Sequence, residues 1–538
     1  MTDQRHAPAR AGIGRATAVM AVGTAASRLS GFARTIVVVA AIGAGGRLAD
    51  SYNDANTLPN VVYDLLLGGV LSAVVVPVLV RARVEDDDGG TAFAQSLLAV
   101  TTSALLAVCA VAELLAPALV HLYVPHGADP AVRAQAVIFA RWFLPQLVFY
   151  GLTAVIGAVL NSRGRFGAPT FVPVLNNAVV ILTALIYLAM PPPGKGSSPL
   201  GLTHAQTLVL AGGTTAGVAV MGLALLPALR TAGVPWRWRT DLSHPGLRDA
   251  RRIAGWVLVY VALSQVGFLV VSRLANEVHA FSPYSNAYQL FQLPYAVVGV
   301  SVVTALLPAM SAHATTGRFD LLRSDLSRGL RLAGTIVVPA SLTLAALAVP
   351  VAQATLGLGR SSPTTAHDAG NVLAVLALGL VPFTVQQLLL RAFYAQQDTR
   401  TPAVLALLVT AVLIVFDFSI AAADHSHTRV VGLAGGFAVA YTVGAVVAAR
   451  LLLTRLDGSG RRVLRLYVRV ALASAIAAGA GWIGAKAVTE ASSHAGAARA
   501  LAALVVGGSV AIVFYLGLAR RMRVRELEPV LATLRRSA

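Results

Sequence analysis

The stretch SRLSGFARTIVVVAAIGAGG, residues 27–46, combines a long apolar run with two arginines, Arg28 and Arg34. Its length and composition are typical of a helix that crosses a bilayer, which takes about 20 mostly apolar residues. An arginine at bilayer depth costs roughly 2.5–3.5 kcal/mol on insertion scales. We therefore expect both guanidinium groups to face a water-filled cavity or an ion-pair partner.

The composition of the whole chain favours an all-α polytopic membrane protein. Hydrophobic residues make up 57% of the 538 residues and charged residues 12%, whereas soluble domains carry about 25% charged residues. Apolar stretches long enough to span a bilayer recur along the chain. They predict fourteen transmembrane helices, over residues 17–42, 51–80, 92–120, 134–160, 169–190, 204–229, 253–276, 284–311, 330–356, 370–390, 402–423, 430–449, 467–487 and 498–519.

The placement of the positive charge predicts the orientation. The formal net charge is +19, and the Lys and Arg residues of the loops and helix ends divide 31 to 8 between alternate sides. Basic residues concentrate on the cytoplasmic side of membrane proteins, so both termini are predicted to be cytoplasmic. Because membrane topology already accounts for the positive charge, nucleic-acid binding is not needed to explain it. No phosphate-binding loop, metal-ligand cluster or nucleophile–base set occurs in the sequence, so we predict no cofactor, no resident metal and no bond-breaking chemistry.

Three local matches predict an internal repeat. GF at 31–32 matches GF at 267–268, an offset of 236; LP at 58–59 matches LP at 293–294; and the proline of NSRGRFGAP (161–169) matches that of YAQQDTRTP (394–402), an offset of 233. Six helices separate the copies, so the two lobes form a parallel repeat, an architecture found in alternating-access transporters. The predicted parts are a cytoplasmic tail (1–16), an N-lobe (17–230), a linker (231–252), a C-lobe (253–454), two further helices (455–519) and a basic tail (520–538).

The two arginines of the first helix are the strongest candidate for binding an anion. Guanidinium groups bind phosphates and other planar anions through forked hydrogen bonds. At the repeat offset their counterparts are Ser264 and Val270, so the charge is specific to the N-lobe. The alternative is internal pairing with an acidic residue of the second helix, for which the candidates are Asp50, Asp54 and Asp64.

Two polar stripes extend the candidate site. The second helix carries Asn53, Asn60 and Asp64, and the eighth carries Gln289 and Gln292. Both stripes are expected to line a cleft between the lobes, and the alternative is hydrogen bonding between helices without substrate contact.

A single acidic residue lies within the predicted eleventh helix. Asp417 stands between two phenylalanines of that helix. A membrane carboxylate of this kind can bind a coupling cation or carry a proton, and it can also simply pair with another group.

Several motifs together carry a resemblance to one family. They are SRLSGFAR (27–34), GAGG (43–46), Asp50 ahead of TLPN (57–60), VP (76–77), NSRGRFGAP (161–169), FQLPYAVVGVSVVTALLPAMS (291–311) and FYAQQDTRTP (393–402). Over about residues 17–455 the chain resembles the MurJ/MviN family of lipid II flippases, which belongs to the multidrug/oligosaccharidyl-lipid/polysaccharide exporter superfamily.

The resemblance implies a flippase of the bacterial inner membrane. Its substrate would be lipid II, the undecaprenyl-pyrophosphate-linked disaccharide-pentapeptide of peptidoglycan synthesis, moved from the inner to the outer leaflet by alternating access. Membrane lipids and cell-wall synthesis proteins are the further partners it implies, and the last two helices would form a groove for the lipid tail. Arg28 and Arg34 match family arginines, and Asp50 matches a family acidic residue.

The chain also departs from the family pattern. Tyr63 and Asp64 stand where the family carries a basic pair, Gln289 stands where it carries an arginine, and Gln292 where it carries an acidic residue. Either the two arginines of the first helix hold the pyrophosphate alone, or Arg141 contributes, or the substrate differs. Export of another polyprenyl-linked oligosaccharide is the second interpretation, and a drug/cation antiporter, which should have an acidic cavity, is the third.

Overall fold

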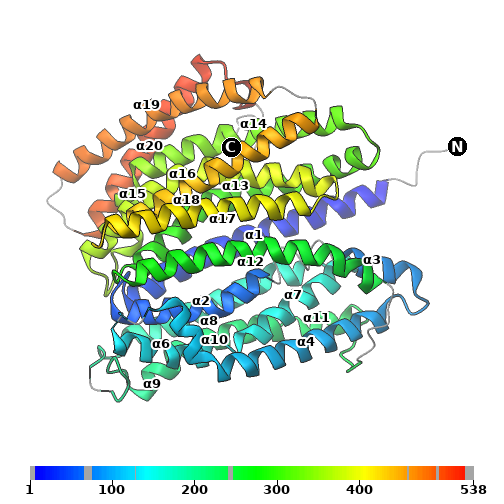
Figure 1. The fold of residues 1–538 in the computed structure, drawn as a ribbon, viewed down its shortest axis with the longest axis horizontal. Coiled ribbons are helices and arrows are strands. Elements are labelled where there is room, and N and C mark those ends of the chain that lie inside the picture. Colours follow the sequence, from blue (N-terminus) through cyan, green and yellow to red (C-terminus); the bar gives the residue numbers. More distant parts are fainter. Residues whose placement is uncertain are drawn as a thin grey trace. The chain divides into compact units, whose positions relative to one another are not determined.

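The computed structural model describes residues 7–65, 76–125, 127, 129–194, 196–239, 246–456, 460–491 and 496–527, which form helices joined by turns and loops (Figure 1). The chain divides into two compact units. Unit 1 comprises Met1–Ile42 and Arg47–Gln265, and unit 2 comprises Gly43–Gly46 and Val266–Ala538.

Unit 1 contains the helices that precede the boundary at Gln265. They are α1 (Ala7–Ile42), α2 (Arg47–Leu65), α3 (Val76–Glu85), α4 (Thr91–Leu114), α5 (Ala116–Tyr123), α6 (Pro130–Phe143), α7 (Gln146–Ser162), α8 (Gly167–Ala189), α9 (His204–Thr207), the π-helix η2 (Leu208–Gly212), α10 (Gly213–Leu223), α11 (Leu226–Thr231) and the first part of α12 (Gly246–Asn276).

Unit 2 contains the remainder of α12 and the helices that follow it. They are α13 (Phe281–Thr315), α14 (Phe319–Ala346), α15 (Ala348–Leu356), α16 (Pro363–Ala395), α17 (Arg400–Ala423), α18 (Arg429–Arg455), α19 (Arg461–Ala491), α20 (Ala497–Arg521) and the 3₁₀ turn η3 (Arg525–Leu527).

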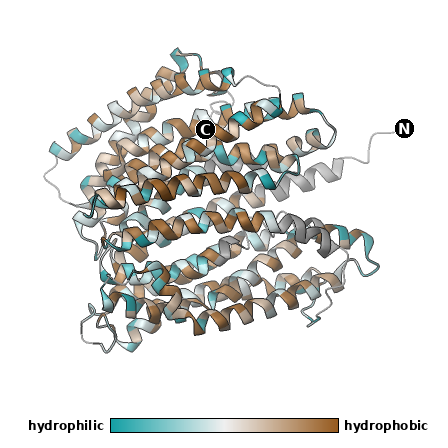
Figure 2. Ribbon diagram, in the orientation of Figure 1, coloured by the Kyte–Doolittle hydropathy of each residue, from teal (hydrophilic) through white to brown (hydrophobic). Residues whose placement is uncertain are grey.

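The structure confirms most of the predicted spans. Twelve segments of the described chain are long and apolar enough to cross a membrane, and each coincides with a predicted span. Of the other two, the span at 51–80 falls on α2 and α3, with residues 66–75 outside the described residues, and the span at 284–311 falls on α13. The total of fourteen stays a prediction. Figure 2 shows the apolar residues running along the helices and the hydrophilic ones gathered toward many helix ends and connections.

The packing inside each unit agrees with the predicted parallel repeat. In unit 1 the second span (α2) packs on the fourth (α6), the third (α4) on the fourth (α7), and both the fourth (α7) and the fifth (α8) on the sixth (α10). In unit 2 the same order of spans gives the same partners: α13 and α14 pack on α16, and α16 and α17 pack on α18. The predicted lobe limits themselves, 17–230 and 253–454, stay a prediction, because the boundary between the compact units falls inside α12.

Two helices are added to unit 2 after the repeat. α19 packs on α20 and on α14, and α20 also packs on α15. Small residues allow the close approach of α19 and α20. A Cβ added to Gly481 would lie 2.6 Å from the carbonyl oxygen of Gly507, and a Cβ added to Gly507 would lie 2.7 Å from the carbonyl oxygen of Gly481. Membrane helices commonly use such small residues to bring their backbones together.

Candidate functional site

The arginine pair lies on α1 of unit 1, as the sequence predicts. Arg28 is exposed and Arg34 is half-buried. The neighbouring turn of α1 is fixed by α8, because the Nδ2 of Asn177 donates to the Ser30 hydroxyl at 2.9 Å and to the Ser27 carbonyl at 3.3 Å. Asn177 is 5% exposed. The buried amide therefore holds the helix that carries the arginines without binding either guanidinium.

Arg34 also interacts electrostatically with α2. Arg34 lies within electrostatic range of the Tyr52 hydroxyl. That hydroxyl is 2.8 Å from the hydroxyl of Thr214, which itself donates to the Leu210 carbonyl at 2.7 Å. Because Thr214 has one proton to donate, Tyr52 is the donor of their shared bond.

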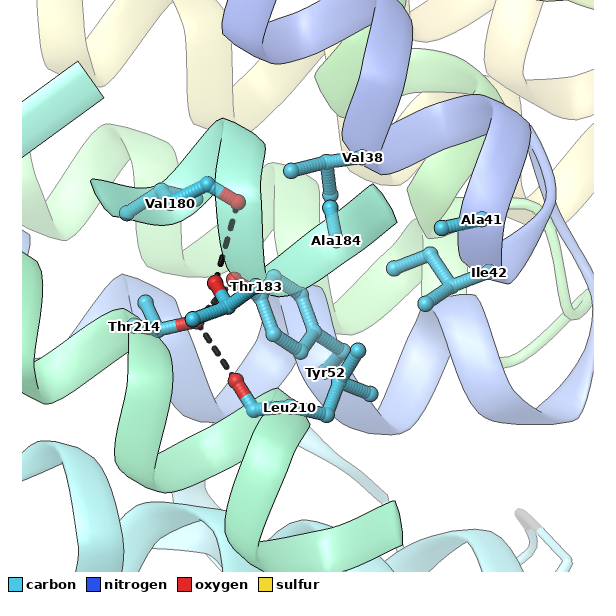
Figure 3. A pocket seen from close by; sticks show the side chains of 9 residues that line it. All are labelled: Val38, Ala41, Ile42, Tyr52, Val180, Thr183, Ala184, Leu210 and Thr214. Atoms are coloured by element: carbon cyan, nitrogen blue, oxygen red, sulfur yellow. Dashed lines mark hydrogen bonds between the residues drawn. The ribbon is translucent and has the colours of Figure 1, made fainter. Parts of the chain in front are cut away.

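Tyr52, Leu210 and Thr214 line a small pocket inside unit 1 (Figure 3). It is enclosed by α1, α2, α8, η2 and α10, and its lining is mostly apolar. Figure 3 shows the Tyr52 ring reaching toward Thr214, with Val38 and Ile42 of α1 among the labelled side chains. The Leu210 carbonyl belongs to the π-helix η2, and π-helical turns occur frequently at functional sites. No pattern in the sequence predicts this irregular turn.

The stripe on α2 is used largely for internal bonds. Asn60 donates to the Asn56 carbonyl at 2.8 Å and accepts from the Tyr150 hydroxyl at 3.3 Å. Asn53 is half-buried, and its carbonyl accepts a bond from the hydroxyl of Thr57 at 2.9 Å. At Asn60, these bonds fit the interpretation of hydrogen bonding within and between helices. They fit less well the interpretation of a polar face whose groups are all open to a substrate.

The acidic residues of α2 differ from the asparagines in burial. Asp50 and Asp54 are 4% and 2% exposed. Both residues interact with other groups of the folded chain. The side chain of Asp64 lies outside the described part of the chain.

In unit 2 the two predicted glutamines lie on the exposed side of α13. Gln289 and Gln292 are both exposed. The nearby Asn286 is 2% exposed, and its Nδ2 donates to the carbonyl of Ala44 at 2.9 Å. The amide of Ala44 donates to the Ser361 hydroxyl at 2.9 Å. The GAGG turn, with φ of 97° at Gly43 and 96° at Gly46, is thus bound into unit 2.

An aromatic cluster in unit 2 was not anticipated from the sequence. We define it as Tyr288, Phe291 and Tyr295 of α13, Phe383 of α16, and Phe437 and Tyr441 of α18. The ring centroids of Phe437 and Tyr441 are 4.4 Å apart, and those of Tyr295 and Phe383 are 4.8 Å apart. The recurrence of aromatic residues every three or four positions along α13 is the signal that could have revealed it.

Asp417 lies in α17 and is sealed inside unit 2. It is 0% exposed, and neither carboxylate oxygen has a hydrogen-bond partner among the described residues. Gly436 of α18 lies against it, with no room there for a Cβ. Tyr284 of α13 is within electrostatic range of the carboxylate. A buried ionised carboxylate without a partner is strongly disfavoured, so this group is either protonated or paired with a cation.

Proteins of known family resemble this chain over most of its length. The family model described as lipid II flippase MurJ matches residues 38–499, so the match begins after Arg28 and Arg34. A Haemophilus influenzae protein named probable lipid II flippase MurJ is 28% identical over 481 residues, which cover 85% of this chain and 89% of the relative. A Burkholderia cenocepacia protein named lipid II flippase MurJ is 27% identical over 475 residues, which cover 85% and 87%.

Solved structures show the same fold. A structure described as lipid II flippase MurJ in an inward closed conformation aligns with a TM-score of 0.73 at 17% identity, over 94% of this chain and 99% of that one. An inward-facing multidrug resistance MATE family transporter of the MOP superfamily aligns with a TM-score of 0.66 at 16% identity, over 80% and 94%. Because the family model spans most of the sequence, this membrane protein belongs to the lipid II flippase MurJ family.

Proposed function

We propose that this chain moves lipid II from the inner to the outer leaflet of the bacterial inner membrane by alternating access. The observation that carries the proposal is the arginine pair of α1, with Arg28 exposed and Arg34 half-buried in an otherwise apolar span. A pyrophosphate offers oxygens that suit two forked guanidinium groups. A membrane potential positive outside favours outward movement of the anion by about 2.3 kcal/mol per charge per 100 mV.

The remaining polar candidates are assigned to the head group and to gating. We assign Asn53, Asn60, Asp64, Gln289 and Gln292 to contacts with the sugars and peptide, whose many hydroxyl and amide groups suit amide side chains. The exposure of both glutamines supports their part in this assignment. Asp50 and Asp54 are assigned to gating or pairing, which their burial supports.

Asp417 is assigned to a coupling ion. Its full burial and its lack of a hydrogen-bond partner among the described residues support this role, because such a carboxylate has to take up a proton or a cation. A change in occupancy would then bias the conformations of unit 2.

The orientation and the partners follow from the same proposal. The excess of Lys and Arg on alternate loops supports cytoplasmic termini. The last two helices, α19 and α20, are proposed to lie along the lipid tail, and proteins of cell-wall synthesis are proposed as neighbours. The protein is proposed to carry out transport without breaking a bond.

The test is complementation of a bacterium depleted of its own lipid II flippase, together with a flipping assay on lipid II in vesicles. We expect the wild-type chain to restore growth and flipping. A control variant, Arg81→Gln, removes one exposed charge from the end of α3 and should behave like the wild type. Growth without measurable flipping, or flipping of another polyprenyl-linked oligosaccharide but not lipid II, would overturn the proposal.

A further inference from the structure

An exposed arginine cluster occupies one end of the α19–α20 hairpin in unit 2. Its members come from the first turns of α19 and the last turn of α20 with the residues that follow, and all seven side chains are exposed: Arg461, Arg462, Arg465, Arg469, Arg520, Arg521 and Arg523.

The two helices bring these arginines to the same level. α19 and α20 are antiparallel and cross at Gly481 and Gly507. Counting equal numbers of residues from that crossing puts Arg469 level with Ala519, the neighbour of Arg520, since each residue advances both helices by the same rise. The buried faces agree, because Leu466, Val470, Ala519 and Val524 pack in one apolar core.

The cluster has no acidic partner among the described residues. Among the residues that the structure describes, no ion pair or side-chain hydrogen bond involves any of the seven guanidinium groups. The nearby carboxylate of Glu526 is taken by Arg331 of α14 at 3.1 Å. Elsewhere, arginines at helix ends do have partners: Arg81 pairs with Glu85, and Arg455 with Asp398.

The local electrostatics of α19 are unfavourable without an external anion. Arg461, Arg465 and Arg469 recur every four residues, so like charges are neighbours on one helix face. The first turn of α19 contains no acidic residue, and its basic residues lie at the end where the helix dipole favours negative charge. A bound anion would relieve both repulsions.

The surface next to the cluster is apolar. Leu464, Val468, Leu472 and Ile476 of α19 are 65%, 52%, 56% and 58% exposed. At helical spacing, Leu472 and Ile476 lie on the same side of α19 as Arg465. Figure 2 shows hydrophobic residues along most of the hairpin's length. A charged end that continues into an apolar face matches a molecule with an anionic head and hydrocarbon chains.

We propose that the arginine cluster binds the head groups of anionic diacyl phospholipids, whose acyl chains lie along Leu472 and Ile476. Topology alone requires only an excess of positive charge near helix ends, in any arrangement. It does not require seven exposed arginines on two adjoining helices with no partner in the described part of the chain. Basic clusters beside membrane helices attract anionic lipids, each arginine near the surface contributing about fivefold in affinity.

The test uses the purified full chain in detergent, with bound lipids counted by native mass spectrometry during titration with phosphatidylglycerol or phosphatidylcholine. The triple variant Arg461→Gln/Arg465→Gln/Arg469→Gln should weaken phosphatidylglycerol binding roughly a hundredfold, which is about fivefold per arginine. The matched control, Arg230→Gln/Arg318→Gln/Arg450→Gln, removes the same charge from three separate exposed positions and should change binding less than about threefold. The corresponding triple Lys variant should retain binding.

Four outcomes would overturn the proposal. Two are that the control variant loses phosphatidylglycerol binding to the same extent, or that the wild type binds phosphatidylcholine equally well. The others are that millimolar inorganic phosphate displaces phosphatidylglycerol, or that lipid II displaces it, which would make the cluster part of the substrate path. Glutamine and arginine have similar helix propensities, so the variants should fold. If the triple Gln variant does not fold, salt titration of the wild type decides: phosphatidylglycerol binding must fall with ionic strength, and unchanged binding would count against the cluster.

Discussion

Gly31 of unit 1 and Gly267 of unit 2 make the same helix contact with different chemistry. A Cβ on Gly31 would lie 3.5 Å from the amide of Asn177 in α8, and one on Gly267 would lie 3.6 Å from Leu413 and 3.8 Å from Thr410 in α17. Thr410 follows Asn177 by 233 residues, the offset that the sequence repeat predicts there. In both units, therefore, the first helix meets the fifth at a glycine.

The side chains around that shared contact have diverged. In the first half of the repeat the neighbours on α1 are Arg28 and Arg34, whereas Ser264 and Val270 stand at the matching positions of α12. Unit 2 instead has its aromatic cluster and the sealed Asp417. The difference teaches that the repeat preserves the approach of the backbones, while each unit is free to carry its own chemistry: in unit 1 the arginine pair to which we assign anion binding, and in unit 2 rigid packing with an ionisable group.

The largest expected effect is on the stability of unit 2. Phe437 is 5% exposed, and its ring centroid lies 5.2 Å from that of Phe291. We expect Phe437→Ala to lower the free energy of unfolding by about 3–5 kcal/mol, because it leaves a cavity within the aromatic cluster. Thermal unfolding in detergent measures this. Phe418→Ala, which removes a 54% exposed ring, is the control and should be nearly neutral.

The next prediction concerns the arginine pair of α1 in unit 1. Arg28→Ala/Arg34→Ala should lower the rate of lipid II flipping at least about a hundredfold, since hydrogen bonds to charged groups are worth about 1.5–3 kcal/mol each. Ser264→Ala/Val270→Ala at the matching positions of α12 should leave the rate within about twofold. Full flipping by the double arginine variant would end the assignment of anion binding to unit 1.

The two intramembrane carboxylates should respond differently to neutralisation. Asp417→Asn should reduce the dependence of flipping on an imposed proton or sodium gradient by about tenfold, within the range of typical coupling energies. Glu113→Gln in unit 1 should preserve that dependence, because Glu113 is half-buried and has Arg141 within electrostatic range. Equal effects of the two substitutions would mean that Asp417 is not the residue that couples flipping to the ion gradient.

A smaller effect is expected beside the cavity of unit 1. Tyr52→Phe removes the bond to Thr214 and should lower the free energy of unfolding by about 1 kcal/mol. A double-mutant cycle with Thr214→Val isolates the bond, and the combined variant should cost less than the sum of the two single ones. Strict additivity would mean that the two hydroxyls do not support each other in the folded protein.

The smallest effect concerns the pH dependence of two matching loops. Burial raises the pKa of Asp398, but hydrogen bonds from Thr401 and Arg455 outweigh it and hold that pKa below its ordinary value. Such a carboxylate stabilises the fold above its unfolded-state pKa, and the contribution is lost as pH falls through the folded-state pKa. Because solvent screens this partly exposed pair, the loss should be at most about 1 kcal/mol.

The matching loop of unit 1 provides the control. Arg163 binds the carbonyls of Gly89 and Ala232 and the hydroxyl of Thr91, all of them neutral acceptors. Acidification to below about pH 4 should therefore increase hydrogen exchange at residues 396–401 more than at residues 163–166. Asp398→Asn should remove the difference between the loops. A pH response of equal size in both loops would show that Asp398 is not its source.

The sequence predicted the fold more fully than the site. The spans could be predicted because length and hydrophobicity are properties of single segments, and the repeat because its glycine and proline matches keep nearly constant offsets. The arginine pair was found for the same reason: a charge inside an apolar segment stands out by itself. The prediction was weakest for polar residues whose partners lie far away in the chain, such as Asn60, which Tyr150 binds.

By itself, then, the sequence determined that this protein is a helical membrane protein with a charged first span and two related halves. Only the tertiary structure decided which polar groups are already in use: Asn286 binds Ala44, Asn177 binds Ser30, and Asp417 is sealed against Gly436. The physical reason is that hydrophobicity acts residue by residue, whereas hydrogen bonds and burial depend on groups that only folding brings together.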